Sequence, residues 1–176
     1  DGLWRLDKNN VWKQYKHVEN DSTSLVSDQV NCLAIGEKGQ LYAATSEGLC
    51  EFLPSKGIFR RISIDAPSQD FTSLVISQGV MWISTSKGIV KYTPGEPVQL
   101  FNKYDGLTCD QFMPNAGLLA SDGRIYFGST RGFNCFYPYL VKINQVAPPV
   151  AITSVELFGQ PIEAGSDQLE KSLSHA

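Results

Sequence analysis

The fold is decided by residues 79–92, GVMWISTSKGIVKY, because the chain contains the pattern of this stretch three times. Each copy has a Gly, an aromatic residue three positions later, two hydroxyl residues, a second Gly, a second aromatic residue and a Pro. The copies are Gly39-Tyr42-Thr45-Ser46-Gly48-Phe52-Pro54, Gly79-Trp82-Thr85-Ser86-Gly88-Tyr92-Pro94 and Gly123-Tyr126-Ser129-Thr130-Gly132-Phe136-Pro138. They recur after 40 and 44 residues. This period in strand-like sequence is typical of a propeller or another repeat array.

Each copy is expected to form four short antiparallel strands, as a propeller blade does. Gly39 provides the positive φ of a tight hairpin turn, and Pro54 ends a strand because it lacks a ladder N–H group. The expected strands are 31–35, 41–45, 49–52 and 58–62; 72–76, 81–85, 89–92 and 98–101; and 117–120, 125–128, 133–136 and 140–143. Segments 2–6 and 11–15 match a third and a fourth strand, so the chain is expected to begin inside a blade.

The predicted class is therefore all-β, with about three and a half four-stranded antiparallel blades in residues 1–144. The blades are expected at about 2–15, 30–62, 71–101 and 115–143. A Pro-rich linker follows at 145–149, because Pro148 and Pro149 favour extended backbone. Residues 150–176 are interpreted as the truncated start of a second β domain, with a strand at 150–157, a turn at 159–161 and a polar tail from Glu163.

The second strand of each copy is apolar on both faces, which indicates a sheet covered on both sides rather than one that faces water. Tyr42, Trp82 and Tyr126 are therefore interpreted as packing between blades, with ligand stacking as the alternative. The repeated hydroxyl pairs, Thr45-Ser46 in the first copy, are expected to hydrogen-bond the backbone of the turn.

Composition excludes several classes of function. The net charge of −3 comes without a basic cluster, so nucleic acid is not an expected partner. No apolar run is long enough for membrane insertion. No secretory leader opens the sequence, so we expect either a piece of a longer protein or targeting encoded outside these residues. Neither a metal nor a cofactor is expected, because the four cysteines form no Cys-x-x-Cys pair.

The cysteines are expected to be buried apolar thiols. They are Cys32, Cys50, Cys109 and Cys135. Cys32 and Cys50 are predicted in the first and third strands of one sheet, and a strand between them would place the two thiols too far apart for a disulfide. The sequence leaves the redox compartment of the protein open.

The chain is predicted not to be an enzyme. It lacks the nucleophile elbow, the phosphate-binding loop and the zinc-protease helix. His17 and His175 lie in polar segments and are expected to be solvated. Carboxylates that could serve a glycoside hydrolase as a pair all lie in predicted loops, where charge is expected without catalysis; they are Glu47, Asp65, Asp70, Asp105 and Asp110.

A binding face follows from propeller topology. Loops between the second and third strands share one face with the loops that lead from one blade to the next, here 16–29, 63–70 and 102–114. Glu47, Lys87 and Arg131 occupy the tips of the loops between the second and third strands. The charge at this position therefore differs between copies, while the surrounding repeat residues stay the same. The 102–114 loop adds Tyr104, Asp105, Asp110 and Gln111, the aromatic, carboxylate and amide groups that suit a sugar. The alternatives are solvated loop tips and packing of the last blade.

The repeats resemble the two-component regulator propeller repeat, over nearly the whole chain. Residues 104–107 and 122–128 are similar to the last blade of such a propeller. Residues 148–153, PPVAIT, resemble the entry to the immunoglobulin-like triple-tyrosine domain that follows it. The resemblance implies a second domain that is a β-sandwich of the immunoglobulin type, of which this chain carries the first strands.

This resemblance implies a periplasmic sensor fragment of a hybrid two-component receptor, of the kind found in gut Bacteroidetes. Its ligands would be oligosaccharides from glycan breakdown, and its signal would go to a histidine kinase outside this chain. A scaffold without its own ligand site and a propeller lyase or hydrolase are the alternatives. Because a partial propeller exposes two blade flanks, the fragment is also expected to self-associate, as a dimer.

Overall fold

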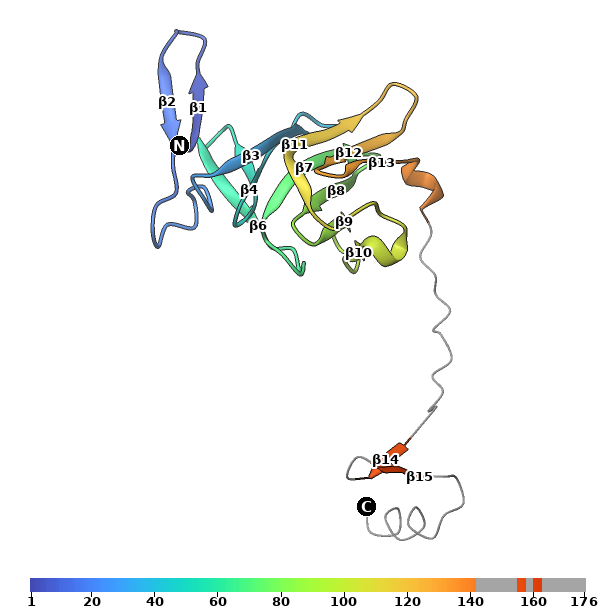
Figure 1. Ribbon diagram of the computed structural model, residues 1–176. Helices are drawn as coiled ribbons and strands as arrows, with labels where there is room; N and C mark the ends of the chain where they lie inside the picture. Colours follow the sequence, from blue (N-terminus) through green and yellow to red (C-terminus); the bar gives the residue numbers. More distant parts are fainter. Residues whose placement is uncertain (142–154, 158–159, 163–176) are drawn as a thin grey trace. The chain divides into compact units, whose positions relative to one another are not determined.

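The computed structural model describes residues 1–141, 155–157 and 160–162 (Figure 1). The chain divides into two compact units, Asp1–Val141 and Lys142–Ala176, and each is described by itself. The linker predicted at 145–149 lies outside the described residues, as does the polar tail from Glu163. The predicted domain boundaries, 1–144 and 150–176, stay predictions.

The first unit consists of four antiparallel sheets in chain order. The strands of these sheets are β1 (Leu3–Leu6) and β2 (Trp12–Tyr15); β3 (Val30–Ile35), β4 (Leu41–Thr45), β5 (Gly48–Leu53) and β6 (Ile58–Ile62); β7 (Phe71–Ser77), β8 (Val80–Thr85), β9 (Gly88–Tyr92) and β10 (Gln99–Phe101); and β11 (Phe112–Leu119), β12 (Ile125–Ser129) and β13 (Gly132–Phe136). Two short 3-10 helices, η1 (Lys103–Asp105) and η2 (Pro138–Leu140), accompany them. Strands pair with their sequence neighbours, so each sheet is a meander.

The repeated glycines make the turns that this topology needs. Gly39 and Gly79 have φ of 79° and 75° in the turns β3–β4 and β7–β8. Gly88 opens β9 with φ of 121°, and a Cβ atom at this position would stand 2.2 Å from the carbonyl oxygen of Phe101 in β10. Glycine at Gly88 therefore allows two neighbouring strands of one sheet to approach closely.

The hydrophobic core lies between the sheets, in three clusters. One cluster joins β1–β2 to the β3–β6 sheet, the second joins the β3–β6 and β7–β10 sheets, and the third joins β7–β10 to β11–β13. Along β4, Ala43 faces the first cluster while Tyr42 and Ala44 face the second. Along β8, Ile83 faces the second cluster and Trp82 the third. Alternate side chains of one strand thus fill opposite interfaces, which confirms that the second strands of the first two copies are covered on both faces, whereas β12 buries only the face of Ile125 and Phe127.

The repeated aromatic residues pack between sheets where a following sheet exists. Tyr42 is buried against the β7–β10 sheet, and Trp82 is buried with Ile125 and Phe127 of β12. Tyr126 is half-buried and contacts Phe133 on its own sheet, with ring centroids 5.9 Å apart. The packing prediction is confirmed for the first two copies.

The predicted role of the hydroxyl pairs is confirmed for the first hydroxyl of each pair, whereas the second hydroxyls Ser46 and Ser86 hydrogen-bond the side chains of Ser27 and Ser68. In each copy, the first hydroxyl donates to the carbonyl of the second Gly and accepts from the N–H of the loop-tip residue. Thr45 Oγ1 lies 2.8 Å from the Gly48 oxygen, and the equivalent bonds occur at Thr85 and Ser129. The hydroxyl thus provides hydrogen-bond partners for backbone groups at the turn.

The last sheet differs from the prediction at both ends. The expected strand at 140–143 is wrong, because Pro138–Leu140 form η2, where Pro138 begins the turn and Leu140 N–H bonds the Tyr137 carbonyl at 3.0 Å. Lys142 and Ile143 lie outside the described residues. The first strand starts at Phe112 rather than 117, because a bulge between Phe112 and Gly117 lets the strand continue through Pro114.

The cysteines follow the prediction in part. Cys32 and Cys50 are buried free thiols in β3 and β5, separated by β4. Cys109 is half-buried, and Cys135 is exposed, so burial was wrongly predicted for these two. Cys135 sits in β13, whose outward face meets no further sheet in the described chain.

In the second unit the described residues form a hairpin of β14 (Val155–Leu157) and β15 (Gln160–Ile162). Leu157 pairs with Gln160 and Glu156 with Pro161. Of the strand expected at 150–157, residues 155–157 form β14, and residues 150–154 lie outside the described residues. The turn expected at 159–161 is wrong, since Gln160 and Pro161 belong to β15.

Candidate ligand-binding site

The segment between β10 and β11, residues 102–111, is folded by its own side chains. Asn102 accepts a hydrogen bond from Tyr104 N–H at 2.8 Å, and Asp105 accepts one from Asn102 N–H at 2.9 Å. This reciprocal capping box starts η1. Gly106 ends it with φ of 100°, a conformation that favours glycine. We name residues 102–111 the crossover loop.

The crossover loop is tied to the sheets on both of its sides. The carbonyl of Asp110 accepts from Gly88 N–H at 2.7 Å, which fixes the loop to β9. Asn134, buried in β13, accepts from Thr108 N–H at 2.9 Å and donates to Thr108 Oγ1 at 3.0 Å. Leu107 packs against the third core cluster. The loop therefore has a defined position between two blades.

The outer side of the crossover loop borders a hollow of about 710 Å³. We name this the loop-face hollow. The residues that line it are Ser86, Lys87, Asn102, Lys103, Tyr104, Thr108, Cys109, Asp110, Gln111, Thr130 and Arg131. Its walls are the crossover loop and the tips of the β8–β9 and β12–β13 turns. Its volume suits a ligand of small-molecule size.

Five of the seven residues proposed from the sequence line this hollow. They are Lys87, Tyr104, Asp110, Gln111 and Arg131. Glu47 lies on the β4–β5 turn and is not among the lining residues. Asp105 lines a neighbouring cavity and holds the capping box described above.

Sequence reasoning missed several lining residues. Ser86 and Thr130 are the second hydroxyls of their repeats, so their place beside the loop tips could have been found from the repeat itself. Lys103 directly precedes Tyr104, and its Nζ atom lies 5.1 Å from the centroid of the Tyr104 ring. Its proximity to Lys87 and Arg131 depends on the crossover loop folding back, for which the sequence carries no local signal.

Positive charge dominates the hollow. Three cationic side chains, Lys87, Lys103 and Arg131, line it together with one carboxylate, Asp110. Within the described chain, ion pairs join Arg60 to Glu51 and Arg124 to Asp122, and none engages the three cations of the hollow. Asp110 Oδ1 accepts a backbone hydrogen bond from Lys103 N–H at 2.7 Å.

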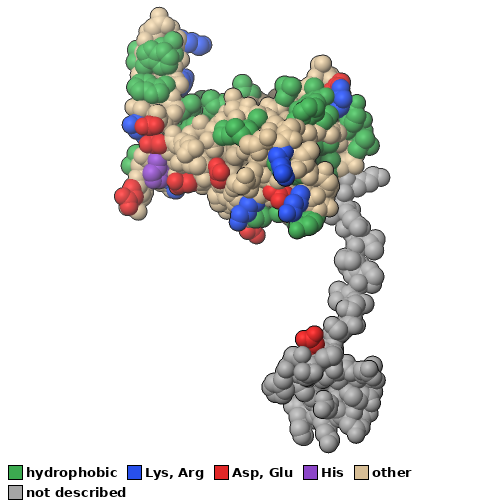
Figure 2. Space-filling model, viewed as in Figure 1, with side chains coloured by type: hydrophobic (Ala, Val, Ile, Leu, Met, Phe, Trp, Pro, Cys, Tyr) green, Lys and Arg blue, Asp and Glu red, His purple; other side chains and the backbone are tan. Residues whose placement is uncertain are grey.

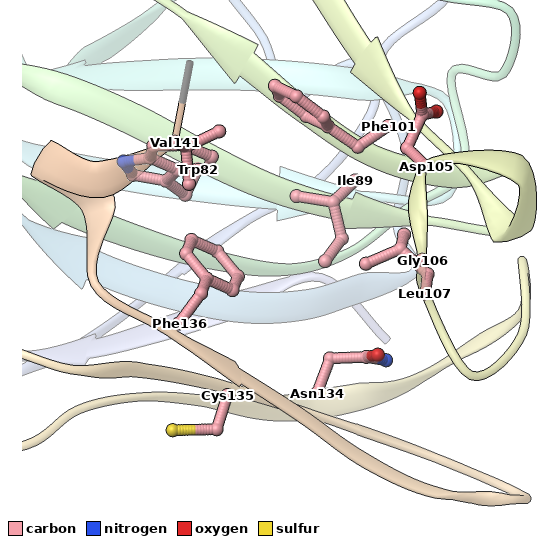
Figure 3. Close-up of a pocket in the computed structure, with 10 residues that line it drawn as sticks. All are labelled: Trp82, Ile89, Phe101, Asp105, Gly106, Leu107, Asn134, Cys135, Phe136 and Val141. Carbon is pink, nitrogen blue, oxygen red and sulfur yellow. The ribbon is translucent and has the colours of Figure 1, made fainter. Parts of the chain in front are cut away.

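An apolar cavity of about 200 Å³ lies on the inner side of the crossover loop. We name this the aromatic slot (Figure 3). Trp82, Ile89, Phe101 and Phe136 surround it, and Asp105 lies at its edge. The ring centroids of Trp82 and Phe136 are 4.9 Å apart. Trp82 is 1% exposed, and its Nε1–H has no hydrogen-bond partner among the described residues.

The described residues offer little toward other kinds of site. Residues 1–141, 155–157 and 160–162 contain no group of three or more His, Cys, Asp and Glu arranged to hold a metal ion. No helix in this part of the chain has the length and apolar character that crossing a membrane requires. The loop-face hollow is therefore the candidate site that we develop.

Comparison with known sequences gives one relative of interest. No protein-family model matches the chain. Histidine kinase P4 of Formosa agariphila is 27% identical over 89 residues, which are 50% of this chain and 6% of that protein. The chain therefore spans a small fraction of the length of this relative.

Comparison with solved structures establishes the fold. PorZ, a type-IX secretion system component of Porphyromonas gingivalis, has a TM-score of 0.54 at 12% identity, over 65% of this chain and 18% of PorZ. Virginiamycin B lyase of Staphylococcus aureus has a TM-score of 0.53 at 13% identity, over 76% of this chain and 47% of the lyase chain. The extracellular domain assigned to a one-component system of B. thetaiotaomicron has a TM-score of 0.51 at 16% identity, over 77% of this chain and 24% of that domain's chain. With the sheet topology, these likenesses confirm the predicted class, a β-propeller made of antiparallel meander blades.

Proposed function

We propose that this chain belongs to the periplasmic, ligand-sensing region of a hybrid two-component receptor, and that an oligosaccharide binds in the loop-face hollow. The relative that is a histidine kinase supports the receptor, as does the likeness in fold to an extracellular domain of a one-component system. The observation that carries the ligand site is the hollow itself, where an exposed tyrosine, an amide, a carboxylate and hydroxyls converge.

The chemistry of the hollow favours binding over catalysis. Hydrolysis of a glycosidic bond by the common route needs two carboxyl groups on either side of the bond, and the hollow is lined by one, Asp110. One of the neighbours in fold is a lyase, but a fold shared at 13% identity does not carry over a reaction. We therefore propose a binding module.

The position of the hollow suits a sensor, because its walls come from two blades. Lys87 belongs to the β7–β10 sheet and Arg131 to the β11–β13 sheet. A ligand that contacts both would favour one relative arrangement of the two blades. Such differential binding is what a ligand needs to shift an equilibrium between two states of a receptor.

The test is a calorimetric titration of plant and host oligosaccharides into the polypeptide that contains this chain together with the rest of its propeller. We expect saturable binding of one glycan family without turnover, which would be checked by chromatography of the ligand after incubation. Cleavage of the ligand would contradict the proposal in favour of an enzyme. A folded protein that binds no glycan would contradict it in favour of a scaffold.

A scaffold is the second candidate, and one observation favours it. The β1–β2 hairpin exposes Trp4, Leu6, Val11 and Trp12, and Figure 2 shows apolar side chains gathered over this hairpin. An apolar flank of this kind fits a second copy of the chain as partner. The scaffold requires that substitutions in the loop-face hollow leave ligand affinity unchanged.

A further inference from the structure

We propose that the loop-face hollow selects an anionic saccharide, one that carries carboxylate or sulfate groups, over its neutral counterpart. This inference rests on the proposed function, and it adds the chemical class of the ligand. The observation that carries it is the gathering of Lys87, Lys103 and Arg131 around one cavity with a single carboxylate among them.

The charge of the hollow contrasts with the charge of the whole chain. The chain has a net charge of −3, yet the hollow carries three cations and one carboxylate. None of these cations is in an ion pair within the described residues, where Arg60 and Arg124 each have a carboxylate partner. Like charges gathered without partners repel one another, and an anionic ligand removes that repulsion.

The backbone beneath each cation is held by a side-chain oxygen. Lys87 N–H donates to Thr85 Oγ1 at 2.9 Å, and Arg131 N–H donates to Ser129 Oγ at 3.3 Å. Lys103 N–H donates to Asp110 Oδ1 at 2.7 Å. The three Cα positions are thus fixed before a ligand arrives, so that binding orders side chains alone.

The three cations have different parts in this recognition. The planar fork of Arg131 matches the two oxygens of a carboxylate or sulfate, whereas Lys87 and Lys103 act as point charges. Tyr104, 88% exposed, presents a ring face to the apolar side of a sugar. Gln111 and the hydroxyls of the turns supply groups for sugar hydroxyls.

The first full copy of the repeat provides an internal comparison. The position that holds Lys87 and Arg131 in the later copies holds Glu47 in the first copy. The repeat itself therefore does not require a cation at the tip of this turn. Positive charge is confined to the two tips that border the crossover loop.

The experiment compares matched oligosaccharides of one length: a neutral one, its uronate form and its sulfated form. Each is titrated by calorimetry into the polypeptide that contains this chain and the rest of its propeller, at low and at physiological salt. We expect the acidic forms to bind at least about tenfold more tightly than the neutral form, since a charged hydrogen bond contributes that much. The advantage should shrink as salt rises.

Two variants locate the effect, with one control. Arg131→Gln and Lys87→Gln should each weaken binding of the acidic forms about tenfold and weaken binding of the neutral form much less. Lys38→Gln, an exposed cation in the β3–β4 turn, should change neither. Melting temperatures confirm that the variants fold.

The outcomes separate the two proposals. Equal or tighter binding of the neutral form would overturn the anionic preference and leave the sensor function standing. Acidic ligands that bind the Arg131→Gln and Lys87→Gln variants as tightly as the unmodified protein would overturn the site. Failure of every saccharide to bind the folded protein would overturn this inference and the proposed function together.

Discussion

At the scale of single residues, the side chain opposite each repeated aromatic ring sets the local chemistry. The cross-strand pairs are Tyr42–Glu51, Trp82–Lys91 and Tyr126–Cys135. Lys91 Nζ lies 5.7 Å from the Trp82 ring centroid. The repeat thus keeps the aromatic ring and varies its neighbour.

These neighbours act on tyrosine acidity. Burial raises the pKa of Tyr42, and the negative charge of Glu51 raises it further. A hydrogen bond with Cys135 is the largest cause that raises the pKa of Tyr126. Both phenols therefore keep their protons to a higher pH than an ordinary tyrosine does.

Trp82 allows a test of how the aromatic slot contributes to stability. Trp82→Ala should lower the free energy of unfolding by about 3–5 kcal/mol, because a large buried side chain leaves a cavity. Trp82→Phe should cost roughly 1–2 kcal/mol. The smaller ring leaves part of the space empty, and removal of the N–H group without a partner offsets part of that loss. Urea unfolding followed by circular dichroism measures both. Tyr104→Ala, at a site 88% exposed, is the control and should change little. A loss for Trp82→Ala as small as that of the control would contradict the packing role assigned to this side chain.

The Cys50 thiol predicts a loss of stability at alkaline pH. Burial is the largest cause that raises its pKa above the ordinary value of 9.0. Above that pH the unfolded chain loses the proton while the folded chain keeps it, so the unfolded state binds fewer protons and stability falls as pH rises, by at most about 1.4 kcal/mol per pH unit. Below that pH the thiol has no effect. Urea unfolding between pH 8 and 10.5 should show the decline, and Cys50→Ala should show a shallower one. Parallel declines would remove Cys50 as the cause.

At the scale of elements, the turn that opens β9 brings backbone atoms of two strands close together. Gly88 has φ of 121° and leaves no room for a Cβ atom beside Phe101, whereas Gly79 has φ of 75° and open space around it. Gly79→Ala should cost about 1–2 kcal/mol from backbone strain alone. Gly88→Ala should cost clearly more, because strands β9 and β10 must separate. Thermal unfolding of the two variants measures the difference. If Gly88→Ala is no more costly than Gly79→Ala, the close approach does not constrain the sheet.

The crossover loop shows how far the sequence leads. The strands and turns were predictable because a turn glycine such as Gly39, or a Pro after a strand, carries its signal locally. The end of the last blade was not predictable in this way, because Pro138 begins a 3-10 turn where a fourth strand was expected at 140–143. The aromatic and charged groups of the 102–114 loop pointed to a site, but Asp105 is used for capping. Lys103 joins the hollow only through a fold that long-range contacts such as Asn134 with Thr108 hold in place.

That contact can be tested by a double-mutant cycle. Asn134→Ala should cost about 1–3 kcal/mol, because Asn134 is buried and its two hydrogen bonds to Thr108 are lost. Thr108→Val should cost less, because it keeps the backbone N–H bond. The coupling energy from the cycle should reach about 1 kcal/mol. Hydrogen exchange of the 103–108 amides should accelerate in the Asn134 variant while exchange in β4 stays slow. A coupling energy of zero would mean that the side-chain bond between Asn134 and Thr108 contributes nothing, and unchanged exchange of the 103–108 amides would mean that Asn134 does not hold the loop.

At the scale of the whole unit, each core cluster lies between two sheets, so a sheet is stable only with neighbours. The β1–β2 hairpin shows this clearly. Its base is fixed by Tyr15, whose ring centroid lies 5.4 Å from that of Phe52, while its other end extends past the β3–β6 sheet (Figure 1). Trp4 and Trp12 on that hairpin contact each other at 6.5 Å between ring centroids and remain exposed. The hairpin is therefore a blade portion that has partners on one side.

This exposed flank predicts self-association of the chain. Sedimentation velocity from about 1 to 100 μM should show a concentration-dependent dimer, because burying two tryptophans of each copy offsets the entropy cost of association. The double variant Trp4→Ser with Trp12→Ser should shift the chain to monomer, whereas Tyr104→Ser, an exposed aromatic on the loop face, should not. A longer polypeptide whose own blades cover the hairpin should stay monomeric at the same concentrations. A monodisperse monomer of the unmodified chain across this range would show that the flank needs no partner, and the apolar hairpin would then contribute nothing to assembly.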